Sequence, residues 1–117
     1  MKSKKKLLRR EADKLWFNKV MEKWNWKSVI SGKIAQQVHH FFPKGRYGHL
    51  RYGLDNGIPL TMGEHFTHHH IGDPTIQQRI IEKLGKKWYN KLRKKSQEKH
   101  YSYITIKWYQ DNIKKLS

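Results

Sequence analysis

The sequence contains no cysteine among its 117 residues. It therefore has no disulfides, no iron–sulfur or zinc–thiolate sites and no catalytic thiol. Long apolar runs are also missing. No stretch approaches the roughly 20 apolar residues of a membrane span, and none resembles the apolar region of a signal peptide, because Lys and Arg recur throughout. We therefore expect a cytoplasmic protein without a membrane partner.

Acidic residues are scarce, since 9 Asp and Glu stand against 26 Lys and Arg, and the formal net charge is +17 with neutral histidines. This charge exceeds what solubility requires in a chain of this size and predicts a polyanionic partner. A low mean hydropathy of -0.99 together with high charge is also typical of disorder. However, five Trp, six Tyr and four Phe favour a folded core. We predict a single domain, residues 1–117.

The hydrophobic pattern predicts an α+β domain made of three parts. Residues 1–35 form a basic lead-in, with an amphipathic helix over roughly 7–24, where apolar residues recur at three- and four-residue spacing. Residues 36–72 form a compact, strand-rich centre. Residues 73–117 form basic C-terminal helices.

Within the centre, residues 36–42 are expected to be extended, because Pro43 opposes a helix. Short strands are expected at 50–52 and 58–60. A short helix is expected at 62–70.

The C-terminal part is expected to contain two helices. In the first, Asp73 provides the cap and Pro74 lies in the first turn. Gly85 costs that helix about 1 kcal/mol relative to Ala, which is not enough to break it. The second helix is expected at 106–116, with Thr105 as its cap.

Seven of the eight histidines fall between positions 39 and 70. Neighbours on a strand point to opposite faces, so His39 and His40 must do different work. On a helix, His65 and His69 lie one turn apart on one face, which is a chelating arrangement. A third imidazole from the strand would complete a metal site with open positions. The competing interpretation is a solvated patch of histidines.

These residues resemble the HNH endonuclease motif. The matching segments are His39-His40-Phe41-Phe42-Pro43, then Asp55-Asn56-Gly57-Ile58-Pro59-Leu60, then His65 and His69, and residues 50–57 are most similar to phage-type members. The basic leading helix is similar, more weakly, to phage recombination nucleases of the NinG type. The resemblance covers about 36–74. It implies a ββα-metal core, metal-dependent hydrolysis of DNA and, for a phage-encoded protein, a location in the host cytoplasm.

One part of the family pattern is missing. Many HNH proteins brace the motif with a structural zinc ion that two Cys-X-X-Cys pairs hold. The matching segments here are Ser28-Val29-Ile30-Ser31 and Thr61-Met62-Gly63-Glu64. Hydroxyl groups are poor zinc ligands at neutral pH. We therefore expect this clamp to be absent, with packing in its place.

By position, the resemblance implies that His40 is the general base. Its ordinary pKa of about 6.5 lets a neutral imidazole take a proton from water. Asn56 either orients the loop at His40 or binds the metal. The cofactor is expected to be one divalent ion: imidazole ligands favour Zn, Ni or Mn, whereas Mg prefers oxygen. The implied metal ligands are His39, His65 and His69, with His68 in reserve for His69.

DNA is the predicted partner, because basic side chains offer phosphate contacts that read no sequence. Arg46 and Arg51 are candidates in the central loop, although both fit a solvated surface as well. The C-terminal helices supply further candidates, namely Lys86, Lys87, Lys91 and Lys94. A non-catalytic nucleic-acid-binding module and a structural metal-binding protein are the alternatives. These residues do not distinguish duplex from branched or single-stranded DNA.

Overall fold

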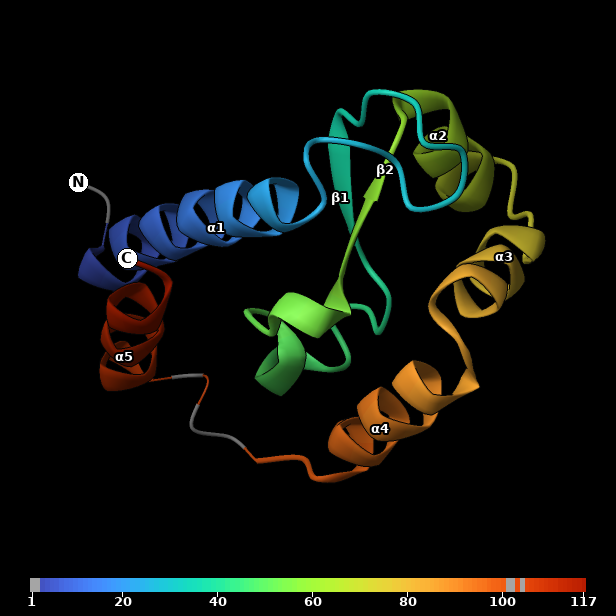
Figure 1. Ribbon diagram of the computed structural model, residues 1–117. Helices are drawn as coiled ribbons and strands as arrows, with labels where there is room; N and C mark the ends of the chain where they lie inside the picture. The colour runs from blue at the N-terminus through green and yellow to red at the C-terminus, as the bar shows by residue number, and fades with distance from the viewer. Residues whose placement is uncertain (1–2, 101–102, 104) are drawn as a thin grey trace.

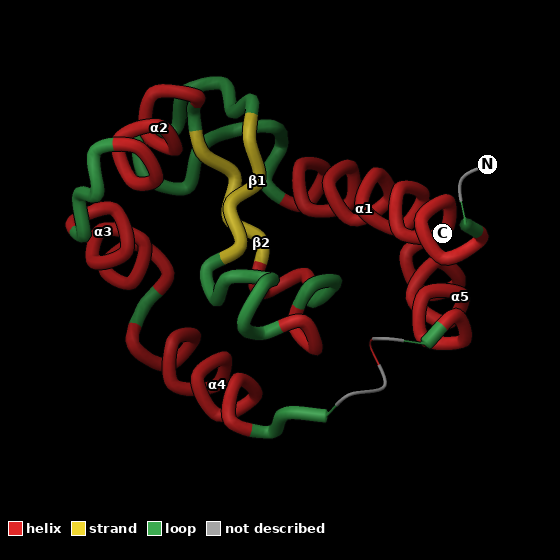
Figure 2. Tube along the Cα trace, turned by 180° about the vertical axis from the view of Figure 1, so that it is seen from behind, coloured by secondary structure: helices red, strands yellow, loops and turns green. Residues whose placement is uncertain are grey.

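A hairpin of two short strands lies at the centre of the molecule, with helices arranged around it (Figures 1 and 2). This computed structural model describes residues 3–100, 103 and 105–117, without the side chains of His69 and His70. The expected α+β class is confirmed. In chain order the elements are α1 (Lys4–Lys23), β1 (Gln37–His40), η1 (Gly48–Leu50), η2 (Leu54–Asn56), β2 (Gly57–Leu60), α2 (Met62–His70), α3 (Thr75–Leu84), α4 (Lys86–Gln97) and α5 (Ile106–Leu116).

The two strands pair antiparallel, with His39 opposite Ile58 and His40 opposite Gly57. All residues of β2 are buried. The expected strand at 58–60 is confirmed, and so is the helix at 62–70, which begins with a capping box between Thr61 and Glu64. Helix α2 can form locally because its capping residues are neighbours in sequence.

The expected strand at 50–52 is wrong. Leu50 ends the 3-10 turn η1, and the backbone N–H groups of Arg51 and Gly53 donate to the carbonyls of Gly48 and Leu50. Local turns therefore satisfy this backbone, which leaves no row of donors and acceptors for a third strand. Tyr52 is buried against α1 and α5 instead.

Helix α1 lies against the hairpin on one side and against α5 on the other (Figures 1 and 2). Its buried face carries Ala12, Trp16 and Val20. The approach to β2 is close: a Cβ at Gly57 would lie 2.6 Å from Val20 Cγ2 and 2.9 Å from Trp16 Cζ2. Gly57 has no side chain, and this allows the helix to pack directly on the strand.

Helices α3 and α4 cover a second core that contains Ile58 and Leu60 of β2. The expectation of one continuous helix here is wrong, because α3 ends at Leu84 and α4 begins at Lys86. Gly85 between them has φ 96° and ψ 155°, a conformation that residues with a Cβ rarely adopt. The break turns α4 so that Trp88 packs on Phe41 and its indole N–H donates to the carbonyl of Asp55.

The last helix and its cap Thr105 are confirmed, whereas Pro74 rather than Asp73 occupies the cap position of α3, because that helix begins at Thr75. Asp73 accepts a hydrogen bond from the Thr75 N–H at the start of α3, at 2.9 Å. Thr105 accepts from the Trp108 N–H at the start of α5. None of the helices that the structure describes is long and apolar enough to cross a membrane.

The segments that match the missing zinc clamp are joined by hydrogen bonds rather than by packing alone. The hydroxyl of Ser28 donates to Glu64 Oε1 at 2.6 Å and accepts from the N–H groups of Ile30 and Ser31. Glu64 Oε1 also accepts from the Thr61 N–H. Burial raises the pKa of Glu64, but the hydrogen bonds from Ser28 and Thr61 outweigh it and lower the pKa. We call this pair the Ser28–Glu64 clasp; it ties the lead-in segment to the first turn of α2.

The clasp predicts a coupled loss of stability. Ser28→Ala should lower the free energy of unfolding by about 1–3 kcal/mol, because the Glu64 carboxylate and two N–H groups lose a buried partner. Urea denaturation of Ser28→Ala, Glu64→Ala and the double variant measures this. We expect the double variant to lose less than the sum of the single losses. Strictly additive losses would contradict a direct interaction between the two side chains.

Candidate active site

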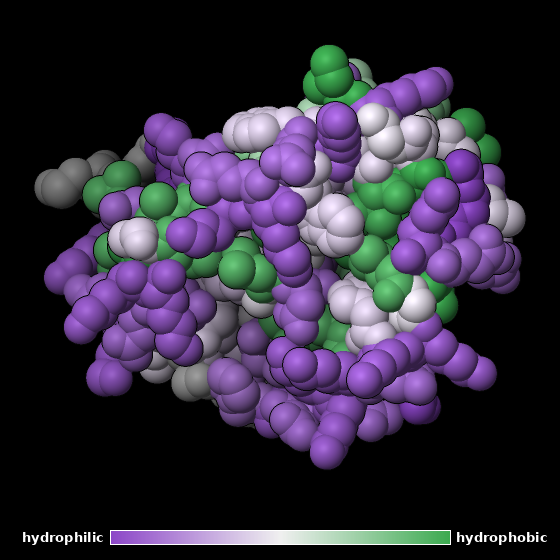
Figure 3. All heavy atoms as spheres, viewed as in Figure 1, coloured by the Kyte–Doolittle hydropathy of each residue, from purple (hydrophilic) through white to green (hydrophobic). Residues whose placement is uncertain are grey.

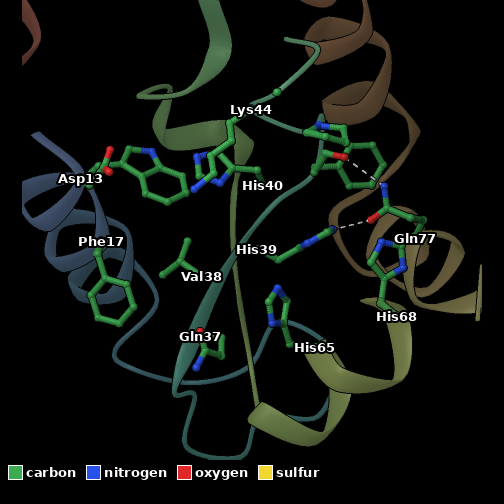
Figure 4. A pocket seen from close by; sticks show the side chains of 14 residues that line it. Asp13, Phe17, Gln37, Val38, His39, His40, Lys44, His65, His68 and Gln77 are labelled. Carbon is green, nitrogen blue, oxygen red and sulfur yellow. Dashed lines mark hydrogen bonds between the residues drawn. The ribbon is translucent and has the colours of Figure 1, made fainter. Parts of the chain in front are cut away.

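A cavity of about 720 Å³ brings together His39, His40 and His65, three of the five predicted catalytic and metal-binding residues. It lies between α1, β1, α2 and the segment after β1, and Figure 4 shows the side chains that line it. As strand alternation requires, His40 lies beside α1 while His39 faces α2 and α3. The lining includes His39, His40, His65, the reserve ligand His68, and three groups that the sequence did not indicate: Gln77, Asp13 and Lys44.

Gln77 determines that the Nε2 atom of His39 acts as a hydrogen-bond donor. The Gln77 side-chain N–H donates to the Phe41 carbonyl at 3.1 Å, so its Oε1 is left to accept from His39 Nε2 at 2.8 Å. His39 Nε2 therefore carries a proton in this contact. Metal-bound histidines typically donate their second ring N–H to such an oxygen. No motif marked Gln77 in the sequence, because it lies 38 positions from His39.

Three imidazoles converge at this end of the cavity. The ring centroid of His39 lies 5.8 Å from that of His65 and 4.8 Å from that of His68. Two imidazoles that share an ion at about 2.1 Å have centroids roughly 5 Å apart. Among the described residues, no three His, Asp or Glu side chains are arranged to hold a metal ion as they stand.

His69, the other expected ligand, belongs to α2. Its side chain lies outside the described part of the chain, so its role stays a prediction. His68 is three positions after His65 and lines the same cavity. The structure thus brings together His39, His65 and the reserve ligand.

His40 occupies a different environment from His39. Its ring stacks on Trp16, with centroids 4.1 Å apart and planes at 11°, and its Nε2 lies 3.0 Å from the Arg51 carbonyl oxygen. A carbonyl only accepts, so Nε2 carries the proton and Nδ1 is the basic atom. Burial lowers the pKa of His40 to about 4, and the nearby charges of Lys44 and Arg51 act in the same direction. The imidazole is therefore neutral, in its basic form, at pH 7.

Asn56 is fully buried and holds the segment that follows His40. Its Oδ1 accepts from the Phe42 N–H at 2.8 Å, and its Nδ2 donates to the carbonyls of Phe42 and Leu50. Asn56 is not among the described residues that line the cavity. Of the two roles that the resemblance implied, these contacts fit the orienting one.

Arg51 supports His40 through its backbone while its side chain is engaged elsewhere. The guanidinium binds both carboxylate oxygens of Asp13, at 3.0 and 2.8 Å, and the Tyr52 hydroxyl donates to the same carboxylate. Burial raises the pKa of Asp13, but the hydrogen bonds from Arg51 and Tyr52 outweigh it and lower the pKa. The positive charge of Arg51 is therefore largely compensated, which weakens its case as a phosphate contact.

The remaining predicted phosphate contacts lie outside the main cavity. Arg46 is exposed and lines a separate small hollow. Hydrophilic side chains cover the lower edge of the molecule, where α4 runs (Figure 3). The predicted lysines of α4 are all exposed, namely Lys86, Lys87, Lys91 and Lys94.

The burial of His40 predicts acid sensitivity in metal-free protein. Because its folded pKa of about 4 lies below the ordinary 6.5, the unfolded chain binds this proton first as the pH falls. The free energy of unfolding should therefore decrease by on the order of 3 kcal/mol as the pH falls from 6.5 to about 4. His40→Phe keeps a stacked ring without a titrating group, so its unfolding free energy should fall less over this window.

Urea denaturation in EDTA across these pH values makes the comparison. The carboxyls of Asp13 and Glu64, whose pKa values are lowered, act mainly below this window. Lys44 and Arg51 remain charged throughout it. Parallel curves for wild type and His40→Phe would contradict the lowered pKa.

The cavity thus combines a neutral imidazole fixed by the backbone with a cluster of imidazoles and a lysine. This set can accept a proton, hold a divalent cation and attract an anion. In comparisons with known proteins, no family model, curated protein or solved structure matches the chain.

Proposed function

We propose that the protein is a metal-dependent DNA endonuclease of HNH type, with β1, β2 and α2 as its ββα-metal core. One observation carries this proposal: His40, neutral and fixed by the Arg51 carbonyl, shares a cavity with the imidazoles of His39, His65 and His68. Binding of nucleic acid alone requires neither the fixed tautomers nor the histidine cluster. The reaction that fits both is hydrolysis of a phosphodiester bond.

The residues present fit one divalent ion. His39 already has the hydrogen-bonded second nitrogen that is typical of a metal ligand, and His65 with His68 or His69 would complete the set. Imidazole ligands favour Zn, Ni or Mn over Mg. When bound, the ion would supply a Lewis acid that stabilises negative charge on the phosphate and on the leaving oxygen.

His40 would act as the general base. Its Nδ1 takes a proton from a water molecule as the water oxygen forms a bond to phosphorus, and the bond between phosphorus and the leaving oxygen breaks. Trp16 and the Arg51 carbonyl hold the ring in place. Asn56 and the Asp13–Arg51 pair are positioning groups, because each holds a backbone segment that His40 depends on.

The net charge of +17 favours association with DNA through its backbone. Lys44, which lines the cavity, brings positive charge next to His40. The exposed lysines of α4 add contacts that do not depend on sequence. A non-catalytic nucleic-acid-binding module would share this charge, so only cleavage separates the two functions.

A nicking assay on supercoiled plasmid tests the proposal. Wild-type protein should nick DNA with at least one of Mg, Mn, Ni or Zn and should be inactive in EDTA. His40→Ala and His40→Gln should lose at least about 100-fold in rate, the usual contribution of a general base. The control is Gln78→Ala, at an exposed position of α3 outside the cavity, which should nick normally.

Circular dichroism spectra should show that all variants remain folded. Nicking by folded His40 variants at the wild-type rate would show that His40 is not the base. Intact plasmid with every metal would reject the nuclease and favour the binding module.

A second measurement tests the role of Gln77. Gln77→Ala should weaken binding of Zn²⁺ or Mn²⁺ by about 10- to 100-fold in calorimetric titrations, because His39 loses the oxygen that fixes its tautomer. Gln78→Ala removes the neighbouring exposed glutamine of α3 and should bind as wild type does. Equal affinity for both variants would contradict the assignment of His39 Nδ1 as a ligand atom.

A further inference from the structure

Three hollows on the protein surface share wall residues. Lys44 lines the 720 Å³ cavity at His40 and also a second hollow of about 230 Å³. Tyr103 lines this second hollow and a third of about 220 Å³. The three hollows therefore follow one another along a single path, which we call the Lys44–Tyr103 path.

The second hollow is formed where α1 and α5 meet the loop that follows β1. Lys5 and Arg9 of α1 line it together with Trp108 of α5. Arg9 Nε donates to the Tyr109 hydroxyl at 3.2 Å, which fixes the guanidinium at this wall. The third hollow is lined by Arg46, His49, Lys99, His100 and Tyr103.

The path is positively charged and poorly compensated. Of the described residues that line the second and third hollows, none is acidic. Arg51 is paired with Asp13, but Lys5, Arg9 and Lys44 take part in none of the ion pairs formed within the described ranges. Such a series of cations attracts a chain of phosphates rather than one isolated anion.

Aromatic rings accompany these cations. Tyr103 and Trp108 are half-buried residues that line the second hollow; the Tyr103 ring packs over Gly48, and the two ring centroids lie 6.0 Å apart. Proteins that bind single strands combine a basic groove with aromatic side chains on which unpaired bases stack. In a duplex the bases are paired and stacked on one another, so they cannot enter narrow hollows between helices. The combination favours a single strand.

We propose that a single-stranded segment of DNA follows the Lys44–Tyr103 path away from the cavity at His40. This inference rests on the proposed function and names its substrate class: DNA with an unpaired segment next to the scissile phosphate, such as a flap or a branch. Phosphates lie against Lys44, Arg9 and Lys5, and then against Arg46 and Lys99. Bases stack on Tyr103 and Trp108.

Binding measurements without metal test the path independently of cleavage. The probe is a fluorescein-labelled oligothymidylate in EDTA, compared with a labelled duplex of equal length, by fluorescence anisotropy over a range of salt concentrations. The path variant is Lys5→Ala/Arg9→Ala. Its control is Lys27→Ala/Lys33→Ala, which removes equal charge from exposed positions that line none of the three hollows.

We expect the path variant to lower the salt dependence of single-strand binding by about 1.4 in log–log slope, since each lost phosphate contact contributes about 0.7. The control should keep nearly the wild-type slope and affinity. Tyr103→Ala should weaken single-strand binding by about 5-fold or more through lost stacking, whereas Tyr103→Phe should retain it. Lys44→Ala, at an exposed loop position, provides a further path variant that leaves α1 intact.

Three results would overturn the path. The first is an equal loss of single-strand affinity in the path and control variants. The second is a loss of duplex affinity in the path variant as large as its loss of single-strand affinity. The third is tighter binding of an oligouridylate than of the oligothymidylate. If the path variants behave as expected but neither the plasmid nor an oligonucleotide with a single-stranded flap is cleaved with any metal, the path stands and the proposed nuclease activity fails. If the plasmid is nicked but the path variants bind the single strand as wild type does, the proposed nuclease activity stands and the path fails.

Discussion

The site depends on the close packing of α1 against the strand hairpin. Because Gly57 has no side chain, Trp16 and Val20 lie directly on β2. The Trp16 indole N–H then donates to the Gly53 carbonyl, and its ring stacks on His40. One turn earlier on the same helix, Asp13 binds the side chain of Arg51. The backbone carbonyl of Arg51 in turn accepts a hydrogen bond from His40 Nε2. A single helix face therefore sets the position, the tautomer and the basicity of one imidazole.

Two adjacent histidines acquire different chemistry from this arrangement. His40 is held between an indole and a backbone carbonyl, where burial lowers its pKa. His39, on the other face of the strand, donates to Gln77 and lies among the rings of α2. In both residues Nε2 lies against an acceptor oxygen. The difference lies in what surrounds each ring: α1 stacks the Trp16 indole on His40, and α2 places two further imidazoles beside His39.

Local signals in the sequence predicted local structure well. The helix at 62–70 and the strand at 58–60 form as expected, and Thr105 caps α5. The errors arose where distant contacts decide the outcome. Gly85 breaks a helical pattern because Trp88 and Leu92 must reach the core, and a glycine-rich loop satisfies its own backbone instead of adding a strand. The histidine cluster was visible from spacing, whereas Gln77, Asp13 and the Ser28–Glu64 clasp join positions more than 35 residues apart that no motif connects.

The scarcity of acidic residues gives the few that are present a structural role. Asp13 links α1 to the central loop, Asp55 binds Lys95 of α4, and Glu64 ties α2 to the lead-in segment. Each holds together segments that are distant in sequence, while most of the 26 basic side chains face no such partner among the described ion pairs. The mutual repulsion of these cations opposes the folded state. A bound polyanion would relieve that repulsion, so under the proposed function binding of DNA would also stabilise the fold.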